Sequence, residues 1–186
     1  MSAGKITNEL FLEILDVLDE RLRENMLNLS LSIYGGTVMM ACYDVRPATK
    51  DIDAIFETSP QIKTILTDIA ETYGLAEDWI NQDIREPLKY VKKENLKELY
   101  TYNHLKVFAP SPEQMLAMKI MSSRAEPFKD FADVEYLIEF LGLETLEQVL
   151  DVFDTYFGRK FLRDRQKMFL NYVGKDLGKS WKEFTV

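Results

Sequence analysis

Two aspartates separated by one residue, Asp51 and Asp53, are the side chains of this chain best suited to chemistry. The segment 51–56 has the composition of a β-strand, and residues two apart on a strand project from the same face. At a rise of about 3.3 Å per residue, the two carboxylates would lie roughly 7 Å apart. Like charges placed in this way repel unless a cation neutralises them, and Mg²⁺ binds one or two carboxylates together with phosphate oxygens. The pair therefore predicts a metal site for phosphoryl or nucleotidyl transfer.

Two adjacent glycines, Gly35 and Gly36, precede the aspartates and separate two predicted elements. Before them, apolar and polar residues alternate over 29–33, which predicts a short strand. After them, the apolar segment 37–43 predicts a short helix, and Thr37 adds a hydroxyl at its start. Glycine lets the backbone approach an anion closely, and a helix start favours negative charge. The turn is therefore predicted to bind phosphate.

The order of these two motifs, G-G-T from Gly35 and D-I-D from Asp51, resembles the DNA polymerase-β-like nucleotidyltransferase superfamily. The segment R-P-A-T-K-D-I-D extends the resemblance to small bacterial and archaeal members, including the AbiEii-like toxins. The resemblance implies that Asp51 and Asp53 are catalytic and hold one or two Mg²⁺. It implies a nucleotide-binding set of Gly35, Gly36, Thr37, Arg46 and Thr49.

A second segment, from Ser111 to residue 134, resembles the lysine, arginine, K/R-D-x-x-D motif of the same small families. The matching residues are Lys119, Arg124, Lys129, Asp130 and Asp133. The resemblance implies catalytic roles for Lys119 and Asp130, and nucleotide binding for Lys129. Lys119 has apolar neighbours, where a cation needs a partner such as a triphosphate or an acid. The alternative is a salt-bridge network in which Lys129 or Arg124 pairs with the two aspartates and braces two helices.

The composition excludes several other kinds of site. Cys42 is the single cysteine and His104 the single histidine, so disulfides, cysteine-based zinc sites, histidine-rich metal sites and a Ser-His-Asp triad are excluded or disfavoured. The chemistry must then come from carboxylates, lysines, hydroxyls and a metal. Since no apolar run approaches the roughly 20 residues that span a bilayer, and no signal peptide is visible, we expect a cytoplasmic protein without a membrane partner.

Capping signals predict the helices that surround the motifs. Thr7 can cap an amphipathic helix, and Ser59 and Ser111, each followed by proline, mark two further helix starts. Gln114 is placed to complete a capping box with Ser111. Trp79, Ile80 and Ile84 predict a short helix.

Two strands at 96–102 and 105–109 are predicted to form a hairpin. The superfamily usually supplies a third carboxylate from a strand next to the D-x-D strand. Glu98 is the only acid within the two predicted hairpin strands, so this third carboxylate is not identified from the sequence.

These elements predict an α/β (α+β) fold. We expect a nucleotidyltransferase-like core with a small mixed β-sheet and packed helices over residues 1–110, and a helical portion over 111–186. The last 36 residues contain 8 Lys/Arg and 5 Asp/Glu, against 15 and 26 in the first 150. This basic end is predicted to be a solvated face, with an RNA-binding surface as the alternative.

The function predicted from these observations is Mg²⁺-dependent transfer of a nucleoside monophosphate from a nucleoside triphosphate to a hydroxyl acceptor. The acceptor is left open between RNA, most plausibly tRNA for a toxin-like protein, a protein and a small molecule. One alternative is a non-catalytic protein that retains the fold to bind a nucleotide or a partner protein, such as an antitoxin. Another is an adenylyltransferase of the aminoglycoside type.

Overall fold

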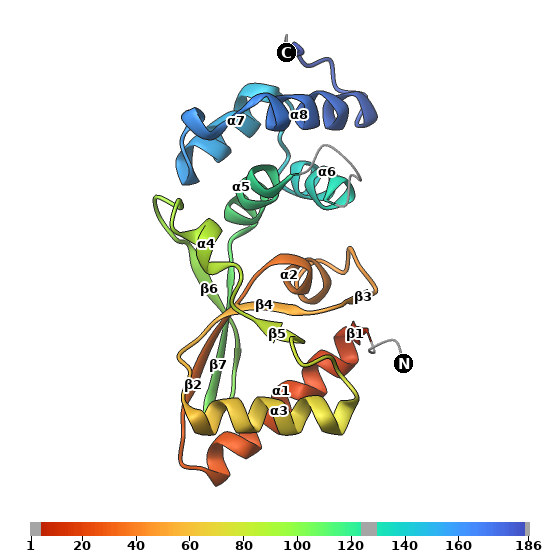
Figure 1. The fold of residues 1–186 in the computed structure, drawn as a ribbon. Coiled ribbons are helices and arrows are strands. Elements are labelled where there is room, and N and C mark those ends of the chain that lie inside the picture. Colours follow the sequence, from red (N-terminus) through yellow and green to blue (C-terminus); the bar gives the residue numbers. More distant parts are fainter. Residues whose placement is uncertain (1–4, 124–129, 185–186) are drawn as a thin grey trace. The chain divides into compact units, whose positions relative to one another are not determined.

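The computed structural model describes residues 5–123 and 130–184 (Figure 1). The chain divides into two compact units, Met1–Arg85 with Leu96–Pro110, and Glu86–Asn95 with Ser111–Val186. The segment Glu86–Asn95, which the sequence places in the first portion, thus belongs with the second unit. Within the described ranges, no helix is long and apolar enough to cross a bilayer.

The first unit is built on a mixed sheet with the strand order β5-β4-β2-β7-β6. Its strands are β2 (Leu29–Ile33), β4 (Ile52–Ile55), β5 (Ile80–Asn81), β6 (Leu96–Thr101) and β7 (Leu105–Pro110). The pairs β2–β4 and β6–β7 are antiparallel, whereas β2–β7 and β4–β5 are parallel. The fold is therefore the mixed α/β class predicted from the sequence.

One face of this sheet is buried under two helices, α1 (Asn8–Glu24) and α3 (Pro60–Tyr73), which lie side by side in Figure 1. Thr7 and Ser59 cap these helices by accepting backbone N–H groups, and Gly74 ends α3 at a φ of 62°. The strand residues buried on this face are Leu29, Leu31, Ile33, Ile52, Ala54, Leu105, Val107 and Ala109. Because alternate residues of a strand face opposite sides, Asp51 and Asp53 are directed to the other face.

Two short elements complete the first unit around the glycine turn. Helix α2 (Gly35–Ala41) follows β2, as the strand–glycine–helix pattern predicts. Strands β1 (Ile6–Thr7) and β3 (Ala48–Thr49) form a separate antiparallel ladder in which Ile6 pairs with Thr49. This ladder joins the start of α1 to the segment that precedes Asp51.

The second unit is helical, and its helices α6, α7 and α8 pack on α5. The described helical elements are α5 (Pro112–Ser122), α6 (Phe131–Phe140), α7 (Leu146–Tyr156), the 3₁₀ turn η1 (Arg159–Phe161) and α8 (Asp164–Asp176), and the short helix α4 spans Arg85–Leu88. Ser111 caps α5 as predicted, but the Gln114 carboxamide accepts the N–H of Asn95 rather than completing a capping box. A capping box is present instead at Thr145 and Gln148 of α7.

Candidate active site

Asp53 lies directly against the glycine turn. Gly35 has a φ of 62°, a conformation that side chains rarely adopt, and a Cβ built there would overlap the carboxylate oxygen Oδ2 of Asp53. The backbone N–H of Tyr34 also donates to the Asp53 carbonyl at 2.8 Å, which fixes the turn against β4. Because glycine has no side chain, the Asp53 carboxylate can pack directly against the main chain of the turn.

Asp51 is held through its main chain by two threonines. The hydroxyl groups of Thr37 and Thr49 both donate to the Asp51 carbonyl, at 3.2 and 3.1 Å. Thr37 is fully buried and Thr49 is 8% exposed, whereas Asp51 itself is exposed. Both threonines therefore position the backbone that presents the Asp51 carboxylate.

Gly36 is closely approached from the segment that follows α2. A Cβ built at Gly36 would lie 2.9 Å from Thr49 Oγ1 and 3.7 Å from the guanidinium nitrogen Nη1 of Arg46. The structure thus brings the predicted residues Gly35, Gly36, Thr37, Arg46, Thr49, Asp51 and Asp53 into one part of the first unit. Whether they bind nucleotide stays a prediction.

Neither residue that flanks Asp53 across the sheet is an acid. On one side Tyr34 donates its N–H to Asp53, and on the other side Asn81 of β5 is in register with Asp53. Asn81 was missed by sequence reasoning because Trp79, Ile80 and Ile84 indicate a helix. The structure shows that this prediction is wrong, since residues 80 and 81 form a strand that pairs with β4.

Glu98 does not fill the position of a third acid either. It is in register with Phe108 of β7 and forms an ion pair with Lys106 at 3.7 Å. The described ranges 5–123 and 130–184 contain no cluster of three or more His, Cys, Asp or Glu side chains suited to a metal. The fit to Mg²⁺ therefore depends on Asp51 and Asp53, and a pair of carboxylates is within what Mg²⁺ uses, because water and phosphate complete its coordination.

The residues of the second predicted motif form an ion-pair cluster within the helical unit. Lys119 Nζ, on α5, lies 2.7 Å from Asp130 Oδ1 and 2.8 Å from Asp133 Oδ2. The lysine and Asp133 are buried, with side chains 9% and 1% exposed, and Asp130 is the residue just before α6. The two carboxylates thus supply the anionic partner that a lysine among apolar residues requires. Arg124 and Lys129 lie outside the described residues.

Four of the eight basic residues of the last 36 form ion pairs with acids of the second unit. Arg159 pairs with Glu147 and Asp151, and three lysines form further pairs. These are Lys167 with Asp164, Lys175 with Glu183, and Lys179 with Glu144. Such internal pairing favours a solvated surface over a strong site for a polyanion.

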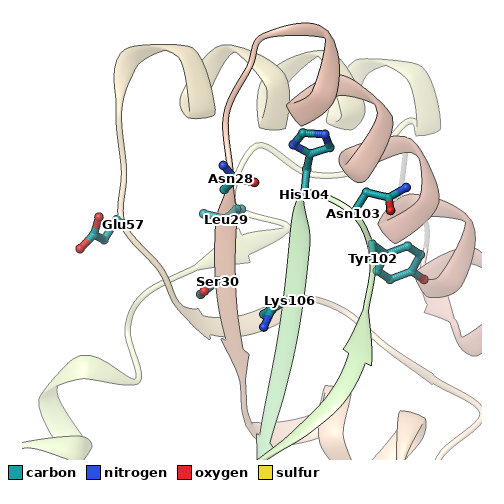
Figure 2. A pocket seen from close by; sticks show the side chains of 8 residues that line it. All are labelled: Asn28, Leu29, Ser30, Glu57, Tyr102, Asn103, His104 and Lys106. Atoms are coloured by element: carbon teal, nitrogen blue, oxygen red, sulfur yellow. The ribbon is translucent and has the colours of Figure 1, made fainter.

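A polar pocket of about 550 Å³ is present at the opposite end of β2 from the glycine turn (Figure 2). Its lining residues are Asn28, Leu29, Ser30, Glu57, Tyr102, Asn103, His104 and Lys106. The His104 ring is held by the Leu27 carbonyl, 3.2 Å from Nδ1, and its backbone N–H donates to Asp19. None of the predicted site residues lines this pocket.

Comparison with known proteins identifies the family to which the chain belongs. Residues 9–173 match the family described as "Nucleotidyltransferase of unknown function (DUF6036)". Among solved structures, the chain is similar to an antigenic nucleotidyltransferase-like protein from Paracoccidioides brasiliensis, at 13% identity and a TM-score of 0.49. That similarity covers 93% of this chain and 91% of the other. No curated protein matches the chain.

Proposed function

Because the chain belongs to this nucleotidyltransferase family of unknown function, we propose that it transfers a nucleoside monophosphate from a nucleoside triphosphate to a hydroxyl acceptor. The observation that carries the proposal is the placement of the Asp53 carboxylate against Gly35. Asp51, the residue just before β4, is exposed, and continued alternation along the chain would direct its carboxylate to the same face as that of Asp53. The two carboxylates can supply ligands for a divalent cation, and the glycine turn can supply backbone N–H groups for the phosphates of a nucleoside triphosphate.

In this proposal Asp51 and Asp53 hold one or two Mg²⁺. Bound there, Mg²⁺ would neutralise the phosphates and polarise the α-phosphate. The contribution of the chain is to keep both carboxylates on one face before any ligand arrives. The hydroxyl groups of Thr37 and Thr49 hold the backbone of Asp51 in place. The pairing of β4 with β2 and β5 holds the backbone of Asp53.

Gly35, Gly36 and Arg46 are proposed to bind the β- and γ-phosphates. Glycine has no side chain of its own to shield the backbone N–H groups of the turn, to which the phosphates are proposed to bind. The Arg46 guanidinium lies beside Gly36, where its fixed planar set of N–H donors suits phosphate oxygens. The hydroxyl groups of Thr37 and Thr49 donate to the Asp51 carbonyl, and their contact with the nucleotide stays a prediction.

The proposed reaction is an in-line displacement at the α-phosphorus. The acceptor oxygen attacks the α-phosphorus in line, the bond between that phosphorus and the β-bridging oxygen breaks, and pyrophosphate leaves while the hydroxyl proton passes to solvent. The predicted roles of Lys119, Lys129 and Asp130 in this step stay predictions. We keep tRNA and small molecules as acceptor classes, and a toxin-like relationship with an antitoxin partner as part of the same proposal.

A non-catalytic nucleotide-binding protein is the second candidate. It is favoured by one observation, that Asn81 and Tyr34, rather than an acid, flank Asp53. Such a protein would bind metal and nucleotide without releasing pyrophosphate.

The test is incubation of the wild-type protein with each α-labelled nucleoside triphosphate, Mg²⁺ and either total tRNA or a panel of aminoglycosides. We expect label transfer to one acceptor, and a loss of at least about 100-fold in Asp51→Asn and Asp53→Asn, since each removes a metal ligand. Asp68→Asn, an exposed acid on α3, is the matched control and should retain full activity.

The same samples separate the two candidates. A wild-type protein that is stabilised by Mg²⁺ and a triphosphate but releases no pyrophosphate with any acceptor supports the non-catalytic function. A protein whose melting temperature is unchanged by every metal–nucleotide combination contradicts both.

A further inference from the structure

The short strand β5 places one polar side chain next to the acid pair. Its residues Ile80 and Asn81 are in parallel register with Ile52 and Asp53 of β4. Neighbouring strands lie about 4.8 Å apart, and residues in register on them face the same side. Asn81 therefore stands beside Asp53 on the sheet face that presents the aspartates.

The position of β5 is firmly set by its surroundings. Trp79 is 2% exposed and its indole Nε1 donates to the Leu66 carbonyl of α3 at 3.2 Å. The Trp79 carbonyl in turn accepts the N–H of Ile52 at 2.7 Å, at the start of β4. A strand this short is stable because it is fixed at this end, so Asn81 is presented in a defined place.

The Asn81 carboxamide is itself oriented. Its oxygen Oδ1 accepts the backbone N–H of Asp83 at 3.0 Å, and the residue is only partly exposed. A carboxamide oxygen has two lone pairs, so one remains available after this hydrogen bond. Carboxamide oxygens are ligands of the same hard type as carboxylates for divalent cations.

We propose that Asn81 is a third, uncharged oxygen ligand of the divalent-cation site formed by Asp51 and Asp53. This inference rests on the proposed function, because it concerns the same metal site. With two carboxylates and one amide, a bound divalent cation is electrically balanced by the protein. A triphosphate can then approach without the repulsion that a third carboxylate would add.

The test measures metal binding rather than activity. Mn²⁺ is titrated into wild-type protein and variants, and the unbound ion is followed by electron paramagnetic resonance. Asn81→Ala removes the oxygen and should weaken Mn²⁺ binding about tenfold. Asn81→Ser keeps a hydroxyl that can accept the Asp83 N–H but is too short to reach the ion, so it should weaken binding to the same extent.

Two controls frame the measurement. Asn103→Ala changes an exposed asparagine in the turn between β6 and β7 and should bind Mn²⁺ as the wild type does. Asp53→Asn removes an acid of the site and should abolish binding. The melting temperature of each metal-free variant establishes that it is folded.

Direct ligation is tested with Asn81→Cys and Cd²⁺, since a thiolate at the site should give a cadmium–thiolate absorption band that Asn103→Cys lacks. The inference is overturned if Asn81→Ala or Asn81→Ser binds Mn²⁺ with wild-type affinity in the same experiment in which Asp53→Asn loses Mn²⁺ binding. That outcome leaves the proposed function standing. Wild-type protein that binds no Mn²⁺, with or without nucleotide, overturns the proposed function and the inference together.

Discussion

The carboxylate of Asp53 occupies the space in which a side chain at Gly35 would have to begin. The two residues are 18 positions apart in the chain, and they meet because β2 and β4 pair antiparallel, with Ile33 opposite Ala54. A substitution at Gly35 should therefore displace the Asp53 side chain, and a larger side chain at position 53 should displace the glycine turn.

Gly35→Ala should lose metal and nucleotide binding as well as stability. The left-handed backbone conformation alone costs an alanine about 1–2 kcal/mol, and the added methyl group must also displace the Asp53 carboxylate. Gly74→Ala is the matched control, because Gly74 has the same φ of 62° and no atom within 4 Å of a built Cβ. Urea unfolding should show the larger loss of stability in Gly35→Ala, and Mn²⁺ titration should show a binding defect only in that variant. Equal binding in the two variants would contradict the assigned site.

Thr37→Val and Thr49→Val should be coupled through the Asp51 carbonyl. Each single variant leaves one donor to that carbonyl and should cost about 0.5–1.5 kcal/mol in the free energy of unfolding. The double variant leaves the carbonyl without either hydroxyl, so its cost should exceed the sum of the single costs. Thr72→Val, which removes an exposed hydroxyl bound to the Asp68 carbonyl, is the control. Strict additivity in a double-mutant cycle would show that the shared acceptor is unimportant.

Lys119→Met should destabilise the chain by about 3–5 kcal/mol, because it removes the buried cation that lies 2.7 Å from Asp130 Oδ1 and 2.8 Å from Asp133 Oδ2. The double variant Lys119→Met/Asp133→Leu removes both charges and should recover much of this loss. Lys167→Met breaks an exposed pair with Asp164 and should cost less than about 1 kcal/mol. Chemical unfolding measures all three, and a Lys119→Met protein as stable as Lys167→Met would exclude a structural role for the cluster.

Stability should fall as the pH rises from about 4.5 to 7, in part because of Glu135. Burial, and then a hydrogen bond with Asp176, raise the pKa of Glu135 from 4.5 to about 7. The folded chain then binds more protons than the unfolded chain in this window, so the free energy of unfolding decreases with increasing pH. Glu135→Gln should flatten the dependence, as seen in melting temperatures across pH 4.5–8. An unchanged slope in this variant would assign the dependence to other groups.

The glycine turn and the D-x-D strand could be predicted because their signals are local. An alternating strand, two glycines and an apolar helix occur in sequence, and the Ser59-Pro60 and Ser111-Pro112 starts are equally local. The clustering of Lys119 with Asp130 and Asp133 was also accessible, since a buried lysine requires acids and these are near in the chain.

The remaining features depend on contacts between distant residues. Asn81 belongs to a two-residue strand that exists only through its pairing with β4, so the apolar pattern around it indicated a helix. The resemblance implies nucleotide binding for Thr37 and Thr49, which stays a prediction, but a motif shows nothing of the burial of its hydroxyl groups. Their shared acceptor, the Asp51 carbonyl, becomes apparent only when α2 and β3 are placed together.

The ladder between β1 and β3 has a practical consequence for anyone who produces this protein. Ile6 pairs with Thr49, two residues before Asp51, so a purification tag or fusion partner attached ahead of Ile6 would emerge close to the acidic pair. Attachment after residue 184 leaves the chain before Ile6 without an extension. A preparation that is inert with an N-terminal tag should therefore be assayed again after removal of the tag, before inactivity is ascribed to the protein.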